Sequence, residues 1–169
     1  KKKKLQVSGD HMTEKTVLIQ IEEKHLACAM GSGSLAVLAT PAVIAVMENA
    51  AAALAQELLG DDTLTTVGTQ IAGEHTAATP LGAEVSAVAK LTEQDGRVFR
   101  FEVTASDKKG EIARGTHTRV SVRAKAFQEK TDTKFSRYHY ILFDLDGTIS
   151  RSAEGIRASL EHAIGELGA

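Results

Sequence analysis

The sequence is poor in cysteine, in aromatic residues and in long apolar runs, and each shortage excludes a structural feature or a class of protein. Cys28 is the single cysteine among 169 residues, so an intrachain disulfide is excluded and we expect a cytoplasmic protein. Aromatic residues amount to 4% and tryptophan is absent, so valine, isoleucine, leucine and alanine must fill the core. No uninterrupted apolar run reaches the roughly 20 residues that cross a bilayer, and the N-terminus lacks the apolar segment of a secretory signal. We therefore expect no membrane association.

The charge balance excludes a large basic surface. The net charge is -2, with 25% charged and 43% hydrophobic residues, which is typical of a soluble globular protein. We therefore expect no nucleic-acid partner. Residues 1–12 begin with four lysines and end in His11-Met12, and we expect a tag or a disordered lead there.

A change of hydrophobic period predicts one long helix over residues 41–59, after a strand over residues 16–23. Thr40 supplies a hydroxyl for the N-cap, Pro41 suits the first helical position, and Gly60 ends the helix. The expected buried face consists of Val43, Met47, Ala50, Leu54 and Leu58.

After the helix, apolar residues alternate with polar ones and predict four more strands. These strands cover residues 64–76, 85–91, 99–105 and 112–124. The last of them carries Ile112, Val120, Val122 and Ala124 at one parity, so we expect these four on the core face. Together the elements predict an α+β domain over residues 13–130, in which a four-strand antiparallel meander wraps a central helix.

Three polar side chains are candidate reacting groups. Glu48 lies in the middle of the apolar helix, where a lone carboxylate must find a partner or bear a desolvation cost. Thr40 stands at the helix N-terminus, whose unpaired N–H groups can polarise a carbonyl, and His75 is a candidate proton carrier near a strand end. Taken singly, Thr40 could be a plain N-cap and His75 a structural histidine. His25 and His117 carry no signal of their own.

Four motifs occur in an order and spacing that resemble the fluoroacetyl-CoA thioesterase branch of the hotdog proteins. They are TPAVIAVME at residues 40–48, GTQI at 68–71, HTAATP at 75–80 and GTHTR at 115–119. The resemblance extends over about residues 15–127. It implies a hotdog fold, hydrolysis of a small acyl-CoA thioester, and a homodimer with its site at the subunit interface.

Carried over by position, the resemblance implies that Thr40, Glu48 and His75 are catalytic. Glu48 would attack the thioester or activate water, while Thr40 and His75 bind and shuttle protons. The resemblance also implies that Gly68 and Arg119 contact the substrate, although Arg119 taken alone would be a solvated strand residue. It implies no metal and no cofactor, because CoA is part of the substrate.

The loop before the helix departs from the family pattern. Residues 31–37 read GSGSLAV and lack the aromatic lid expected of a fluoroacetate-specific enzyme. We therefore expect a broader short or branched acyl-CoA substrate. Two alternatives stay open at this point, a domain that binds acyl-CoA without hydrolysing it and a hydratase acting on enoyl thioesters.

The spacing of two candidates raises a geometric question. Eight helical residues separate Thr40 from Glu48 by about 12 Å along the axis, too far for both to touch one small acyl group. Either the helix starts later and its first turn folds back, or the two side chains come from different protomers.

The C-terminal part has a different composition. A polar linker is expected over residues 131–137, followed by an apolar strand that runs into FDLDGT at 143–148. This motif resembles the first motif of haloacid-dehalogenase-type phosphatases, in which the aspartates act on phosphate and bind Mg²⁺. Since only residues 149–169 follow it, we expect residues 138–169 to be an incomplete segment without phosphatase activity or a stable Mg²⁺ site.

Overall fold

The computed structural model describes residues 13–135 and 161–162. Contacts divide the chain into two units between Thr131 and Asp132, and the elements described below belong to the first unit except for Asp132, the last residue of α3. The phosphatase-like motif at 143–148 and the lead at 1–12 lie outside the described residues.

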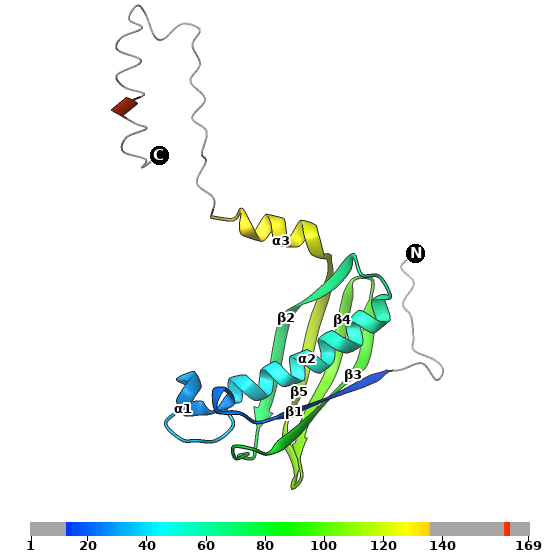
Figure 1. The fold of residues 1–169 in the computed structure, drawn as a ribbon. Coiled ribbons are helices and arrows are strands. Elements are labelled where there is room, and N and C mark those ends of the chain that lie inside the picture. Colours follow the sequence, from blue (N-terminus) through cyan, green and yellow to red (C-terminus); the bar gives the residue numbers. More distant parts are fainter. Residues whose placement is uncertain (1–12, 136–160, 163–169) are drawn as a thin grey trace, which may run out of the picture. The chain divides into compact units, whose positions relative to one another are not determined.

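The first unit consists of one long helix, α2 (Thr40–Leu59), against one antiparallel sheet. The strands are β1 (Glu14–Gln20), β2 (Leu64–His75), β3 (Glu84–Asp95), β4 (Val98–Asp107) and β5 (Gly110–Arg123). Three short helices complete it: η1 (Glu23–His25), α1 (Ala27–Met30) and α3 (Ala124–Asp132). Figure 1 shows α2 lying across one face of the sheet, and α2 contacts all five strands. The predicted α+β architecture is therefore confirmed.

The predicted limits of α2 need one correction. Ala39 occupies the N-cap position and no side chain caps the helix, whereas Thr40 is already helical. The predicted N-cap is therefore wrong by one residue, and the Thr40 hydroxyl is left for another partner. At the other end, Gly60 adopts the left-handed conformation (φ 57°) and ends the helix as predicted.

Small residues let α2 pack closely on the sheet, which explains a core so poor in aromatics. Its buried residues are Ala42, Val43, Val46, Met47, Ala50, Ala51, Leu54 and Ala55. Four of the five predicted core positions are among them. The fifth, Leu58, is 38% exposed. At this end of the helix the face that packs on the sheet passes through Ala55 and then Leu59, which are four residues apart.

By length and composition alone, α2 is apolar enough to cross a membrane, since polar residues interrupt it only sparsely. The core helix of a globular domain passes the same test. Eight of its 20 residues are buried against the sheet, which accounts for its hydrophobicity without a bilayer.

The strand order is β1-β3-β4-β5-β2, so the predicted four-strand meander is wrong in one connection. Only β3, β4 and β5 form a meander. β2 pairs with β5 at one edge, and the segment over residues 76–83 carries the chain across to β3, which pairs with β1. The crossing brings β2 and β5 side by side, and these two strands carry the polar residues discussed below.

The face of β5 that meets the helix also differs from the prediction. The adjacent residues Ile112 and Ala113 are both buried, and the register between β4 and β5 shifts at this point. A bulge of this kind inserts one residue and reverses the faces beyond it. As a result His117 and Arg119 are buried beneath α2, whereas Val120, predicted to face the core, lies on the opposite face and is only half-buried.

The chain continues from β5 directly into α3, a helix that was not predicted: the last strand was expected to end at residue 124 and the linker to begin at residue 131. The segment is rich in good helix formers, and Lys125 and Glu129 approach to 3.9 Å one turn apart.

Candidate active site

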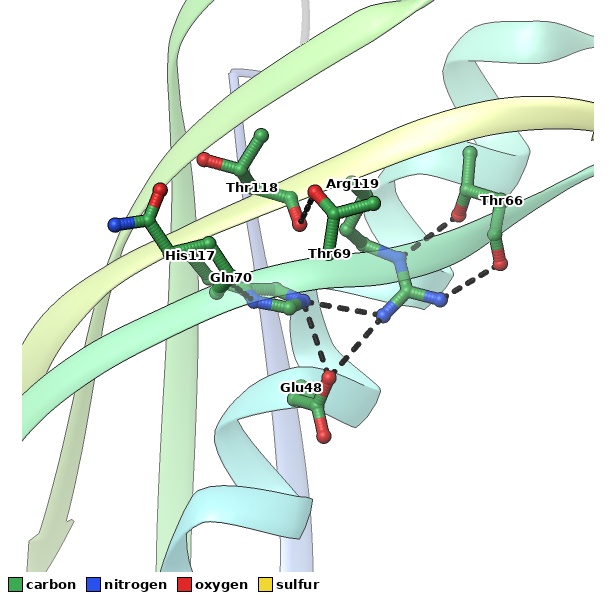
Figure 2. A network of polar contacts seen from close by, with 7 residues as sticks. All are labelled: Glu48, Thr66, Thr69, Gln70, His117, Thr118 and Arg119. Carbon is green, nitrogen blue, oxygen red and sulfur yellow. Dashed lines mark hydrogen bonds and ion pairs between the residues drawn. The ribbon is translucent and has the colours of Figure 1, made fainter.

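Glu48 projects from the middle of α2 toward β5 and is not the enclosed acid that its apolar neighbours suggested. Its side chain is 38% exposed. One carboxylate oxygen, Oε1, lies 3.4 Å from Nε2 of His117 and 3.8 Å from Nη1 of Arg119. Figure 2 shows the other oxygen pointing away from both residues. The carboxylate thus has one oxygen toward the buried His117–Arg119 pair and one directed away from it.

The imidazole beside Glu48 is that of His117, which was not among the predicted catalytic residues. Its signal was its position two residues before Arg119, because residues i and i+2 of a strand share a face. On β4, Phe101 and Phe99 stand opposite these two residues, so the polar pair lies beside the apolar core.

The contacts of His117 fix where its proton lies. Nδ1 is 2.7 Å from the carbonyl oxygen of Gln70, which can only accept, so Nδ1 donates. Nε2 is 3.1 Å from Nη1 of Arg119, which can only donate, so Nε2 accepts. The imidazole is therefore neutral, in agreement with burial, which lowers the pKa of His117. Its approach to Glu48 is consequently not an ion pair.

Arg119 is the cation that attracts Glu48. Its Nε donates to Oγ1 of Thr66 at 2.8 Å, and Nη2 donates to the carbonyl oxygen of Thr66 at 2.8 Å. Burial lowers the pKa of Arg119 and the nearby Glu48 opposes this shift. The guanidinium still stays protonated, because its ordinary pKa is far above neutrality. Most of its donors are directed at the protein, and the predicted contact with substrate stays a prediction.

Gly68 stands opposite Arg119 on β2, in the space that Glu48 needs. A Cβ atom at Gly68 would come within 2.5 Å of Oε1 of Glu48 and 3.0 Å of Cε1 of His117. The absence of a side chain therefore lets the carboxylate reach the His117–Arg119 pair, and the predicted contact of Gly68 with substrate stays a prediction.

Thr40 and His75 form a second cluster at the start of α2. Thr40 Oγ1 and His75 Nδ1 are 3.0 Å apart. The other ring nitrogen of His75, Nε2, is buried without a hydrogen-bond partner among the described residues. Leaving a buried polar atom unpaired costs about 1–3 kcal/mol. A bound group that met this nitrogen would remove the cost.

One chain does not bring the two clusters together. α2 is a regular helix from Thr40 onward, which excludes the folded-back first turn and keeps Glu48 about 12 Å away along the axis. The sheet gives a similar separation, since Ile71 pairs with His117 and lies four residues, or about 13 Å, before His75. Of the three predicted catalytic residues, the structure joins Thr40 with His75 and leaves Glu48 apart.

A cavity of about 840 Å³ includes residues that follow β2 in its lining. It is lined in part by Ala77, Ala78 and Pro80 of the HTAATP segment and by Lys108 and Lys109 of the β4–β5 turn. None of the predicted catalytic residues lines it. In the part of the chain that the structure describes, no group of three or more His, Cys, Asp or Glu side chains could hold a metal ion.

Comparison with known proteins places this arrangement in a family. The family model for fluoroacetyl-CoA-specific thioesterases matches residues 14–125. The fluoroacetyl-CoA thioesterase of Streptantibioticus cattleyicolor is 40% identical over 68 residues, which cover 40% of this chain. The match spans about half, 49%, of that relative's length.

Solved structures agree on the fold. The F36A mutant of the fluoroacetyl-CoA-specific thioesterase FlK, in complex with fluoroacetate and CoA, superposes with a TM-score of 0.66 at 28% identity. The alignment covers 72% of this chain and 98% of that one. A hot-dog-like protein from Thermanaerovibrio acidaminovorans has a TM-score of 0.65 at 18% identity, over 74% of this chain and 92% of its own, and shares the fold. The predicted hotdog fold is confirmed, and the chain belongs to the fluoroacetyl-CoA-specific thioesterase family.

Proposed function

We propose that the protein hydrolyses a small acyl-CoA thioester to the free acid and CoA. The observation that carries the proposal is the Glu48 carboxylate, held toward Arg119 by one oxygen while the other points away from the protein network. A solved relative at 28% identity was crystallised with fluoroacetate and CoA. A domain that only held acyl-CoA would have no need of a partly exposed acid beside the buried residues in the middle of α2.

The open oxygen of Glu48 can act in two ways. It can take a proton from water while the water oxygen attacks the thioester carbonyl, after which the C–S bond breaks and the thiolate takes up a proton. It can also attack the carbonyl itself, giving an anhydride that water then hydrolyses. In both routes Thr40 and His75 bind the acyl group or deliver the proton to the departing thiolate. Neither route needs a metal or another cofactor.

Completion of the site requires a second copy of the chain under this proposal. Groups that act on one carbonyl must lie within about 3–3.5 Å of the reacting atoms. Thr40 and Glu48 of one chain are several times farther apart than that. A homodimer that sets Glu48 of one protomer against Thr40 and His75 of its partner would meet the requirement.

The activity is tested by thiol release from a panel of acetyl-, fluoroacetyl-, isobutyryl- and crotonyl-CoA. We expect free CoA from the short and branched acyl groups without strong preference for fluoroacetyl, because residues 31–37 contain no aromatic side chain. Binding without thiol release would identify a binding module. Loss of the crotonyl double bond without free CoA would identify a hydratase.

The shared site is tested with mixed dimers. Glu48→Gln and His75→Ala chains are each expected to be inactive, but their co-refolded equal mixture should regain about a quarter of the wild-type thiol release. Half of the dimers are then mixed, and each mixed dimer has one site with both groups intact. A mixture as inactive as its components would show that the site does not combine these residues across two chains.

A further inference from the structure

A continuous run of polar contacts leads from the backbone of β2 to the carboxylate of Glu48. The Gln70 carbonyl accepts from Nδ1 of His117, Nε2 of His117 accepts from Nη1 of Arg119, and Nη1 faces Oε1 of Glu48 (Figure 2). We propose that His117 is a positioning residue for thioester hydrolysis: it holds the Arg119 guanidinium so that Arg119 attracts one oxygen of Glu48 and leaves the other to react. This inference rests on the proposed function.

The guanidinium is oriented by acceptors on two sides. Oγ1 and the carbonyl oxygen of Thr66 hold Nε and Nη2, both at 2.8 Å. The Nη1 end, nearest Glu48, has His117 Nε2 as its hydrogen-bond acceptor. Because guanidinium donors lie in one plane in a rigid fork, fixing both sides also fixes the direction in which Nη1 attracts a carboxylate. Without His117, that end would be free to tilt away.

His117 has no ring nitrogen left for a substrate. The residue is 2% exposed, and protein partners hold both of its nitrogens. Its Nε2 lone pair also faces Oε1 of Glu48 at 3.4 Å, and two lone pairs at that distance do not form a hydrogen bond. The carboxylate is therefore attracted by Arg119 rather than by the imidazole. Any effect of His117 on the reaction must pass through Arg119.

Two substitutions of His117 separate this role from a purely structural one. The amide of Gln reaches the place of Nε2 and can accept from Arg119, whereas the amide of Asn reaches the place of Nδ1 and can only keep the bond to Gln70. We expect His117→Asn to lower kcat for thiol release by between about ten- and a hundredfold with little change in KM, the size of effect that misplacing a reacting group by about 1 Å has. His117→Gln should restore most of that kcat.

If His117 merely ties β5 to β2, the order reverses: Asn keeps activity and melting temperature while Gln loses both. That result, or wild-type kcat in both variants, overturns the inference. Should neither variant fold, Thr66→Val decides, since it removes one of the two acceptors on the opposite side of the guanidinium, the hydroxyl that holds Nε of Arg119. We expect it to lower kcat, whereas the control Thr92→Val should not, since it removes a strand threonine hydroxyl that donates to the carbonyl oxygen of Arg100 and makes no contact with Arg119. Equal activity of these two variants would overturn the inference.

Failure of the inference can be told from failure of the proposed function. Wild-type protein that releases no thiol from any acyl-CoA contradicts the function itself. Wild-type release that is lost in Glu48→Gln but unchanged in His117→Asn leaves the function standing and removes only the positioning role.

Discussion

Replacing Glu48 by glutamine is expected to lower kcat for thiol release by about 10²- to 10⁴-fold, the contribution typical of a positioned base. The amide keeps an oxygen that can accept from Arg119, so the side chain can stay where it is. It has no oxygen that can take a proton from water or attack a carbonyl. Because the carboxylate is more than a third exposed, the loss of its attraction to Arg119 should lower the free energy of unfolding by less than about 1 kcal/mol.

Glu57 on the same helix provides the matched control. It pairs with Lys15 of β1 and is remote from His117 and Arg119 along α2. Glu57→Gln removes one helical carboxylate without touching the site, so its kcat should equal that of the wild type. Steady-state thiol release and thermal unfolding of both variants are the measurements. Full activity in Glu48→Gln would exclude a chemical role for this carboxylate and with it the proposed mechanism.

The long helix could be predicted because its signal is local. Val43, Met47, Ala50 and Leu54 repeat at helical spacing, and all four are buried. The same pattern made Glu48 conspicuous, since an acid within such a helix has no local explanation. Pattern alone could not say how exposed the acid is, because that depends on the strands across from it.

The partners of Glu48 could not be predicted, and the reason lies in β5. Hydrophobic alternation assigns Val120 and Val122 to the core, yet the buried side chains are those of His117 and Arg119. The bulge that reverses the two faces of β5 cannot be recognised from the residue composition of the strand. Polar side chains can occupy the inner face because they satisfy each other and the strand β2, as buried polar groups must. The resemblance to the family marked Arg119, and the one signal for His117 was its position two residues before Arg119 on the same strand.

The order of the strands escaped prediction for a related reason. Short turns join β3 to β4 and β4 to β5, and the residues of these turns predict them. The segment over residues 76–83 has the length of an ordinary loop but passes two strands, β5 and β4, to reach β3. That crossing pairs β2 with β5 and so places Gly68 opposite Arg119. Non-local pairing therefore builds the Glu48 cluster, and local sequence carries little information about it.

Gly68→Ala is expected to lower kcat by about a hundredfold while leaving the melting temperature nearly unchanged. The new Cβ would lie 2.5 Å from Oε1 of Glu48, so the carboxylate must move off the position in which Arg119 attracts it. A displacement of about 1 Å in a reacting group is enough for a loss of this size. The fold should tolerate the change, because the φ angle of Gly68 lies outside the left-handed region and the nearest atom is the end of a flexible side chain. The ring of His117, whose Cε1 would be 3.0 Å from the new Cβ, needs to shift by only a few tenths of an ångström. Thiol release and thermal unfolding of the variant measure the two effects separately.

The double variant with Glu48→Gln shows whether Gly68 acts through Glu48. If the alanine methyl group matters because it displaces the carboxylate, adding Gly68→Ala to Glu48→Gln should cost little further activity, since the reacting oxygen is already gone. If the loss of kcat in the double variant is the product of the two single losses, Gly68 acts independently of Glu48, for instance by presenting its backbone N–H to the thioester oxygen. Wild-type kcat in the single variant would mean that Glu48 does not react from the position in which His117 and Arg119 surround it. The polar cluster beneath α2 would then be part of the core rather than of the active site.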